Sequence, residues 1–198
     1  DNIQRLQIHT NGSLRKPAWW ADLAKRFSHL QQFNIWFAID GIGDVHSYYR
    51  QGTDYNRIIE NAKAFINAGG HAVWQFIPFK HNEHQIKDCM RLSQQLGFKK
   101  FHFVKNARYK QQAFHYGTGE PLDIQPWQLD ENFNRVHKIK NSVDKKNCMH
   151  LNMPSIFLSA RGLVTPCCYM STTDLNDVDI SKDFSYNTFK DICIARCG

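Results

Sequence analysis

The sequence predicts an α/β fold built on a parallel sheet, and two observations carry this prediction. Segments typical of strands alternate with amphipathic segments of helical length through the first half of the chain. Glycine and proline residues stand where such segments begin and end. Because this alternation is typical of right-handed βαβ units, we expect an open parallel sheet or a partial barrel. Four successive units are too few to close an eight-stranded barrel.

The first two strands frame one helix. Ile3 to His9 is typical of a strand, and the turn formers Thr10-Asn11-Gly12 end it. Pro17 suits the first turn of a helix, where its missing N–H costs nothing. Ala18 to Leu30 then has the apolar spacing of a helix, and Asn34 to Ile39 is a short strand.

Two further helices and two further strands follow. An amphipathic helix ends at Gly69-Gly70, and His71 to Phe79 is the next strand. Asn82 can cap the following helix, with Gln85 at the reciprocal position of a capping box. Lys100 to Val104 is a fourth strand. The inner stripe of the helix before it is Ile86, Cys89, Met90, Ser93 and Leu96.

The remainder of the chain is less regular. Asn106 to Pro126 carries several turn formers and is interpreted as a linker, and Trp127 to Ile139 as one more helix. The 198 residues, 42% of them hydrophobic, suit one large domain or one and a half. No apolar run approaches the ~20 residues of a membrane span, so we expect a soluble protein. The formal charge of +7 is spread along the chain without a nucleic-acid motif, which makes nucleic-acid binding unlikely.

Cysteine placement near the end of the chain predicts a metal centre. Cys148, Gly162 and Cys167 form C-x13-G-x4-C, and Cys193 and Cys197 form C-x3-C. The stretch from residue 156 to 164 is typical of two short β-runs around a turn, which would bring Cys167 back toward the segment of Cys148. Thiolates gathered in this way are typical of metal ligands.

The cysteines could form disulfides or bind a metal. Disulfide scaffolds are usually short and secreted, whereas this chain is long, shows no signal peptide and has an unpaired-looking Cys89. Reduced cysteines indicate the cytoplasm. Spacing alone leaves an iron–sulfur cluster and structural zinc equally open. Cys168 is either a spare core thiol or a group that faces an active site.

The carboxyl ends of the strands are the expected place for chemistry, because the loops there are free to vary. Four segments occupy that edge: Thr10 to Gly12, Asp40-Gly41, Pro78 to Asn82, and Lys105 onward. Each taken singly is more typical of a turn or a cap than of a binding site.

The order of these segments resembles a known family. Ile8 to Gly12, then Phe37 to Gly41 with His46 and Arg50-Gln51-Gly52 downstream, are similar to consecutive strands of radical S-adenosylmethionine (radical SAM) enzymes. The helix that ends at Gly70, the strand leading to Asn82-Glu83 and the Leu96-Gly97 turn continue the pattern. The C-x13-G-x4-C element resembles the opening of the SPASM/Twitch extension of that family.

The resemblance implies a partial parallel (β/α) barrel, an incomplete TIM-like barrel that begins at its third strand. A small β-hairpin and a helix would follow as a cluster-binding extension. The implied organisation is a partial barrel over residues 1–110, a linker and helix over 111–147, and the auxiliary cluster segment over 148–198. The implied cofactors are S-adenosylmethionine, an auxiliary 4Fe-4S cluster, and a second 4Fe-4S cluster on an upstream segment. The implied reaction is reductive cleavage of S-adenosylmethionine to a 5′-deoxyadenosyl radical, which is chemistry of the cofactor.

The resemblance also implies roles for individual residues. Asp40 falls in the ribose-contacting motif, and Arg50 falls where several members pair a residue with the methionyl carboxylate. Asn82 falls near the adenosine. Cys148 and Cys167 match the first two ligands of the auxiliary cluster. The remaining cysteines, Cys193 and Cys197, are either its third and fourth ligands or the start of a longer series.

The chain departs from the family pattern in three places. It has no C-x3-C-x2-C, it lacks the glycine-rich motif after the second strand, and Ala38 replaces a common serine. We therefore expect a segment of a longer enzyme that is inactive by itself. By analogy, a peptide or small metabolite would be the substrate and a flavodoxin or ferredoxin the electron donor. The alternative is a non-catalytic zinc or iron–sulfur module on a degenerate barrel.

Overall fold

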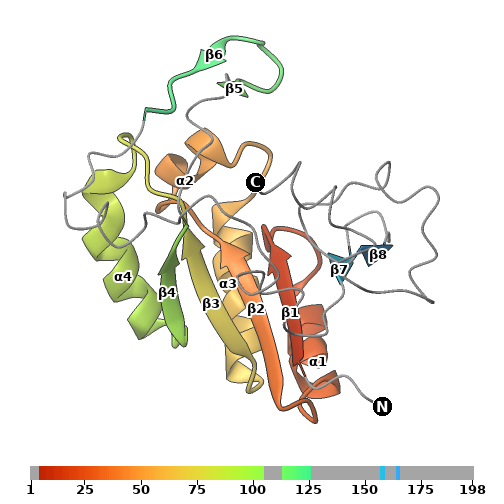
Figure 1. Cartoon of the computed structure of the whole chain (residues 1–198). Helices are drawn as coiled ribbons and strands as arrows, with labels where there is room; N and C mark the ends of the chain where they lie inside the picture. Colours follow the sequence, from red (N-terminus) through yellow and green to blue (C-terminus); the bar gives the residue numbers. More distant parts are fainter. Residues whose placement is uncertain (1–4, 105–112, 126–156, 159–163, 166–198) are drawn as a thin grey trace, which may run out of the picture. The chain divides into compact units, whose positions relative to one another are not determined.

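A four-stranded parallel sheet forms the centre of the described chain (Figure 1). The computed structural model describes residues 5–104, 113–125, 157–158 and 164–165. The chain divides into two units, Asp1–Leu129 and Asp130–Gly198. The sheet belongs to the first unit, and its order is β1-β2-β3-β4 with every neighbouring pair parallel. The strands are β1 (Arg5–Thr10), β2 (Gln32–Ala38), β3 (His71–Phe76) and β4 (Lys100–Phe103). The predicted α/β class with a parallel sheet is confirmed, and its extension into a partial barrel stays a prediction.

Three helices connect these strands, as the alternation of segments predicts. They are α1 (Pro17–Arg26), α3 (Tyr55–Asn67) and α4 (Ile86–Gln95), the last preceded by the 3₁₀ turn η1 (Glu83–Gln85). Pro17 occupies the first turn of α1, as expected. A further helix, α2 (Asp44–Tyr49), lies between β2 and α3, where the sequence pattern predicts no helix. No helix in the described part of the chain has the length and apolar character needed to cross a membrane.

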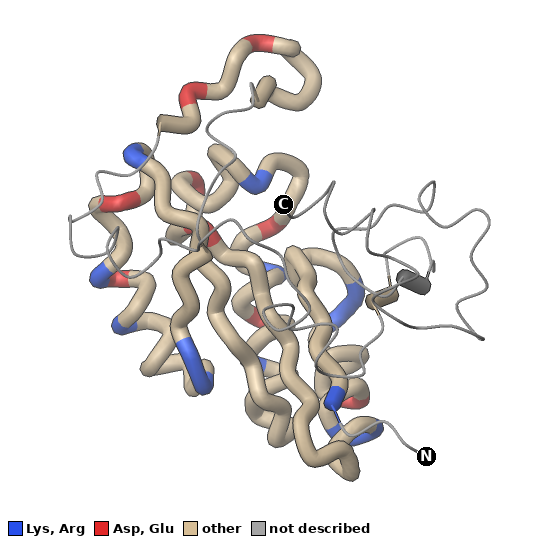
Figure 2. The backbone as a smooth tube through the Cα atoms, viewed as in Figure 1, with Lys and Arg blue, Asp and Glu red and all other residues tan. Residues whose placement is uncertain are grey.

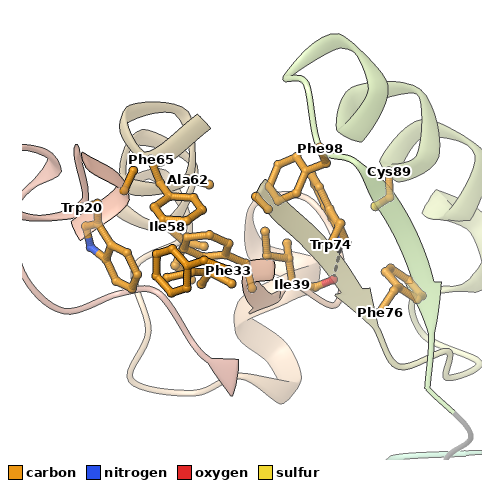
Figure 3. Close-up of a cluster of buried hydrophobic side chains, with 14 residues drawn as sticks. Trp20, Phe33, Ile39, Ile58, Ala62, Phe65, Trp74, Phe76, Cys89 and Phe98 are labelled. Atoms are coloured by element: carbon orange, nitrogen blue, oxygen red, sulfur yellow. Dashed lines mark hydrogen bonds between the residues drawn. The ribbon is translucent and has the colours of Figure 1, made fainter. Parts of the chain in front are cut away.

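One face of the sheet packs against the helices. Alternate strand residues, among them Ile35, Phe37 and Trp74, are fully buried there. Figure 3 shows this cluster, in which Trp74 donates its indole N–H to the Ile39 carbonyl at 2.9 Å. The cluster also takes in Cys89 of α4, so the prediction that this thiol faces the core is confirmed. Met90, expected beside it on the inner stripe, is 39% exposed and lies on the outer side of α4.

The third strand ends earlier than predicted. It stops at Phe76 instead of Phe79, because Pro78 has no N–H to donate. The N–H of Ile77, which would otherwise continue the ladder, is bound by the carboxylate of Asp40. The chain leaves the sheet at this point and enters the loop that carries Asn82.

The segment interpreted as a linker contains a β-hairpin in its described part. Strands β5 (Ala113–Phe114) and β6 (Pro121–Leu122) pair antiparallel. Leu122 and Ile124 pack with Ile77 and Phe79 in a second, smaller core cluster. The hairpin therefore belongs to the same packed unit as the sheet.

A second hairpin lies in the other unit. Strands β7 (Phe157–Leu158) and β8 (Val164–Thr165) pair antiparallel, with Leu158 opposite Val164. The predicted pairing of two short β-runs is thereby confirmed, and the turn between them lies outside the described residues. The cysteines at 148, 167, 168, 193 and 197 lie outside the described residues.

Charged residues are interspersed over the described backbone. Figure 2 shows Lys and Arg mixed with Asp and Glu along the elements, without one sign gathered on a single element. Most of these side chains are exposed, whereas Asp40 is fully buried. The buried carboxylate of Asp40 therefore stands apart from the exposed charges as a candidate site residue.

Candidate functional site

The carboxyl end of β2 brings together the three residues that the sequence predicts for the cofactor. Asp40 is the second residue after β2, Arg50 directly follows α2, and Asn82 lies in the loop after β3. Although Asp40 and Asn82 are 42 residues apart, the Asn82 side-chain amide donates to the Asp40 carbonyl at 2.9 Å. Arg50 donates from Nε to Asp40 Oδ2 at 2.6 Å. The structure thus places all three around one point of the sheet edge.

Asp40 is the buried centre of this group. Its side chain is 0% exposed. Oδ1 accepts the N–H of Ile77 at 2.7 Å, while Oδ2 accepts from Arg50. A carboxylate removed from water in this way needs such partners to remain charged. Asp40 therefore links the ends of β2 and β3 and holds a cation beside them.

The side chain of Arg50 is partly exposed to solvent. Its exposed fraction is 21%, and its guanidinium carbon lies 5.3 Å from the centre of the Tyr49 ring. Arg50 caps the C-terminus of α2, and its N–H donates to the His46 carbonyl at 3.0 Å. Among the described residues, no hydrogen bond from the two terminal guanidinium nitrogens to the protein is seen. Asp40 holds the side chain at Nε, and the outer edge of the guanidinium is formed by its two terminal nitrogens.

His46 connects Asp40 to Arg50 by a second route. The Asp40 N–H donates to His46 Nδ1 at 3.1 Å, and His46 Nε2 lies 3.0 Å from Thr53 Oγ1. Thr53 Oγ1 in turn donates to the Arg50 carbonyl at 2.5 Å. Burial, and secondarily the charge of Arg50, lower the pKa of His46 to about 4. The imidazole is therefore neutral at physiological pH.

Asn82 does not cap α4, so the predicted capping box is wrong. Its Oδ1 accepts the N–H of Phe79 at 2.7 Å, and its Nδ2 donates to the carbonyls of Asp40 and Ile77. The predicted partner Gln85 instead accepts the Ile42 N–H at 2.8 Å through Oε1. Both side chains fasten the loop after β3 to the loop after β2, because these tertiary partners are closer than the helix terminus.

Two residues at the end of α2, Tyr48 and Gln51, bind the β5–β6 hairpin. Tyr48 exchanges hydrogen bonds with the backbone of Asp123, and Gln51 bonds the backbone of Phe114 and Tyr116. Both anchor the β5–β6 hairpin beside Arg50. The ring of His81 stacks on Phe79 and contacts Tyr48 at a tilt, and both of its ring nitrogens are buried without a hydrogen-bond partner in the described part of the chain.

The other face of the sheet carries polar and aromatic side chains and no described helix (Figure 1). The rings of His9 and His102 lie 5.1 Å and 4.9 Å from that of Trp36. His9 Nδ1 lies 3.3 Å from Gln75 Oε1. Burial, and secondarily the charges of Lys100 and His9, lower the pKa of His102. His9 is exposed, and Trp36, Gln75 and His102 are half-buried.

The predicted metal ligands have no described geometry. Cys148, Cys167, Cys193 and Cys197 all lie outside the described residues. Within the described ranges, no group of three or more His, Cys, Asp or Glu side chains could hold a metal ion. Cys89 is buried, and burial, with smaller contributions from Asp88 and Asp40, raises its thiol pKa to about 12.

Sequence reasoning missed the parts of the site that depend on tertiary contacts. It noted His46 only as part of a pattern, and it did not single out Thr53, whose hydroxyl completes the connection to Arg50. It also missed the backbone N–H of Ile77 as the partner of Asp40. Only the short spacing of Asp40, His46 and Arg50 within one loop and helix hinted at a contact between them.

Comparison with solved structures yields a distant likeness, whereas the other comparisons find nothing. No family model matches the chain, and no curated protein matches it. Among solved structures, the chain is similar to native anSMEcpe with bound AdoMet, with a TM-score of 0.42 and 14% identity. The match covers 56% of this chain and 30% of that one, so it spans less than a third of the solved protein. A likeness at this level assigns no role to any residue here.

Proposed function

We propose that the carboxyl edge of the sheet binds S-adenosylmethionine and that Arg50 receives its methionyl carboxylate. The observation that carries this proposal is the Asp40–Arg50 pair. Its anion is fully buried, its cation is 21% exposed, and only Nε of the guanidinium is bound by Asp40.

The geometry of the pair suits an α-carboxylate. A guanidinium has five N–H donors in a planar fork, and a carboxylate can accept two of them in parallel. Asp40 fixes the orientation of the fork from behind and partly offsets its charge. A ligand carboxylate that meets the outer edge finds donors already oriented, so less side-chain entropy is lost on binding.

Asp40 and Asn82 have a structural role in the site. Asp40 is 0% exposed, and each polar side-chain atom of Asn82 has a partner within the chain. Both therefore hold the loops that surround Arg50. Contact of Asp40 with a ribose hydroxyl, and of Asn82 with the adenosine, stay predictions that require this edge to open.

The finer function is a radical S-adenosylmethionine enzyme that acts on a peptide or small metabolite. It is supported by the order of sequence segments and by the C-x13-G-x4-C element. A bound iron–sulfur cluster would supply the electron that cleaves the cofactor. Because Cys148, Cys167, Cys193 and Cys197 lie outside the described residues, we assign no geometry to the auxiliary cluster.

The experiment compares two ligands that differ only in the carboxylate. Dissociation constants of S-adenosylmethionine and decarboxylated S-adenosylmethionine are measured by calorimetry for the whole chain. The native chain is expected to prefer S-adenosylmethionine by about 10- to 100-fold, the range of a charge-assisted hydrogen-bonded pair. Arg50→Gln should lose this preference and still bind the decarboxylated ligand.

Arg57→Gln is the matched control, because Arg57 is exposed on α3. This variant should keep the native preference. If the native chain binds neither ligand, or if Arg50→Gln keeps the native preference, the proposal is wrong.

A further inference from the structure

Four residues close a ring of hydrogen bonds at the edge of the sheet. Asp40 donates its N–H to His46 Nδ1, and His46 Nε2 bonds Thr53 Oγ1. Thr53 Oγ1 donates to the carbonyl of Arg50, whose Nε returns to Asp40 Oδ2. We call this set, Asp40, His46, Thr53 and Arg50, the polar ring. Its members are separate in sequence but form one closed circuit.

The direction of each bond follows from the backbone donor. The Asp40 N–H can only donate, so His46 Nδ1 must accept and cannot carry a proton. In the neutral imidazole the hydrogen then sits on Nε2 and is donated to Thr53 Oγ1. The threonine hydroxyl is left free to donate to Arg50. Each of the four bonds thus joins a donor to an acceptor, and the tautomer of His46 is determined by geometry.

The ring holds Arg50 at both of its ends. Asp40 binds the guanidinium, while Thr53 binds the main-chain carbonyl of the same residue. The Arg50 N–H also donates to the carbonyl of His46. If Arg50 were bound only at Nε, its main chain could move and change the direction of the guanidinium. Here the hydrogen bonds to its carbonyl and N–H also fix the main chain.

We infer that His46 is a positioning residue that aims Arg50 at the ligand carboxylate, acting through Thr53. His46 itself is 0% exposed, so it acts on Arg50 through its neighbours. This inference rests on the proposed function, because it assigns His46 to the same site. The inference adds His46 and Thr53 to the site. We expect both residues to affect the binding of ligands that carry the carboxylate, and not of ligands that lack it.

Thr53 offers the sharpest test, because it is only half-buried and a change there leaves the core intact. Thr53→Val removes the hydroxyl at nearly constant volume, and Thr53→Ser retains it. We expect Thr53→Val to lower the preference for S-adenosylmethionine over its decarboxylated form by about 3- to 10-fold, as for one lost hydrogen bond. Thr53→Ser should stay within about twofold of the native preference.

A second variant addresses His46 directly. His46→Asn can still accept from the Asp40 N–H, but its shorter side chain does not reach Thr53. We expect it to lower the preference at least as much as Thr53→Val. Ser93→Ala serves as a control for general loss of stability, because Ser93 is buried on α4 and bonds only the Met90 carbonyl. This control should lower stability and leave the preference unchanged.

A readout without ligand completes the test. The Nε–H of Arg50 is bound to a buried carboxylate, so it should give a slowly exchanging arginine side-chain signal in nitrogen-15 spectra. That signal should broaden or vanish in Thr53→Val and His46→Asn, and persist in Thr53→Ser and Ser93→Ala.

The outcomes separate the two proposals. A native chain without any preference for the carboxylate overturns the proposed function and this inference with it. A native chain that shows the preference, together with Thr53→Val and His46→Asn variants that keep it and the Arg50 signal, overturns the inference alone.

Discussion

Asp40 continues the hydrogen-bond ladder between β2 and β3 with its side chain. The last backbone bond of the pair runs from the Ile39 N–H to the Gln75 carbonyl at 2.9 Å. The next donor, the N–H of Ile77, is accepted by Asp40 Oδ1 at 2.7 Å. The carboxylate therefore stands where a backbone carbonyl would stand in a longer strand. Its negative charge is what lets the same side chain hold Arg50.

The substitution Asp40→Asn should separate the acceptance of the Ile77 N–H from the pairing with Arg50. The amide oxygen can still accept the Ile77 N–H, but the charge that pairs with Arg50 is lost. We expect a loss of about 2 kcal/mol in the free energy of unfolding, since one member of a buried pair is neutralised. Urea unfolding measures this loss. Asp44→Asn is the control, because Asp44 is exposed and should change stability by less than about 0.5 kcal/mol. Equal effects of the two substitutions would contradict the assigned role of Asp40.

Gly12 and Gly52 form a natural pair for separating backbone strain from a steric clash. Their φ angles are +71° and +73°, so alanine is strained at either position. A Cβ at Gly12 would lie 2.6 Å from Cδ1 of the buried Phe37, whereas a Cβ at Gly52 meets nothing within 4 Å. Gly52→Ala should cost about 1 kcal/mol, and Gly12→Ala a further 1–3 kcal/mol or so for the clash. Urea unfolding of both variants gives the difference, and equal losses would show that Phe37 moves aside freely.

Periodicity was sufficient to predict the sheet and the longer helices. The apolar alternation of β2 and the spacing of Ile58, Ala62 and Phe65 on α3 each report a buried face directly. The meeting of Asp40 and Asn82 also followed, because parallel strands present their carboxyl ends at one edge, whereas the contact of Arg50 with Asp40 did not follow from this rule.

Short elements and tertiary contacts could not be predicted in this way. Helix α2 has six residues and β5 and β6 have two each, too few for any period to show. Asn82 has the composition of a helix cap, but Asp40 and Ile77 offer its amide closer partners. The polar ring depends on the distance between His46 and Thr53, which no local pattern encodes.

Acid should destabilise the fold through His46. The pKa of His46 is about 4 in the folded chain against 6.5 for a free imidazole. The unfolded chain therefore binds the proton first, and the free energy of unfolding falls as the pH drops from 6.5 to 4. The shift corresponds to about 3 kcal/mol. The groups that face the His46 imidazole are Arg50, Asp40 and Thr53, together with the ring of Tyr55, whose centre lies 5.8 Å from that of the imidazole.

The His46→Asn variant isolates this contribution, because asparagine does not titrate. The stability difference between the native chain and the variant should be largest above pH 6.5 and shrink toward pH 4. Unfolding in urea at a series of pH values measures it. A difference that is constant over this range would mean that the folded imidazole is already accessible to protons.

His81 should be replaceable by phenylalanine at no cost. Its ring stacks with Phe79 at 5.2 Å and lies tilted against Tyr48 at 4.7 Å, but among the described residues neither ring nitrogen has a hydrogen-bond partner. Burial, helped by His84 and opposed by Asp123, lowers the pKa of His81. His81→Phe keeps the stacking and removes two unsatisfied polar atoms, so we expect a gain of about 1 kcal/mol at pH 7. The gain should increase at lower pH, because the unfolded histidine takes up a proton more readily than the folded one.

Thermal unfolding at pH 7 and pH 5 tests this expectation. His71→Phe at the exposed start of β3 is the control and should change the melting temperature little. A marked loss of stability in His81→Phe would indicate that the imidazole has a hydrogen-bond partner.

Metal content should distinguish the cysteines predicted as ligands from the one in the core. Cys89 is fully buried on α4, and its thiol pKa of about 12 keeps it protonated, whereas metal ligation requires the thiolate. Cys148→Ala or Cys167→Ala should therefore abolish metal retention, and Cys89→Ala should leave it intact. Anaerobic reconstitution followed by iron, sulfide and zinc analysis measures this. A brown protein with a broad band near ~400 nm favours an iron–sulfur cluster, and a colourless protein with stoichiometric zinc favours the non-catalytic module. Loss of metal in Cys89→Ala would contradict the ligand assignment, because a protonated core thiol cannot hold an ion.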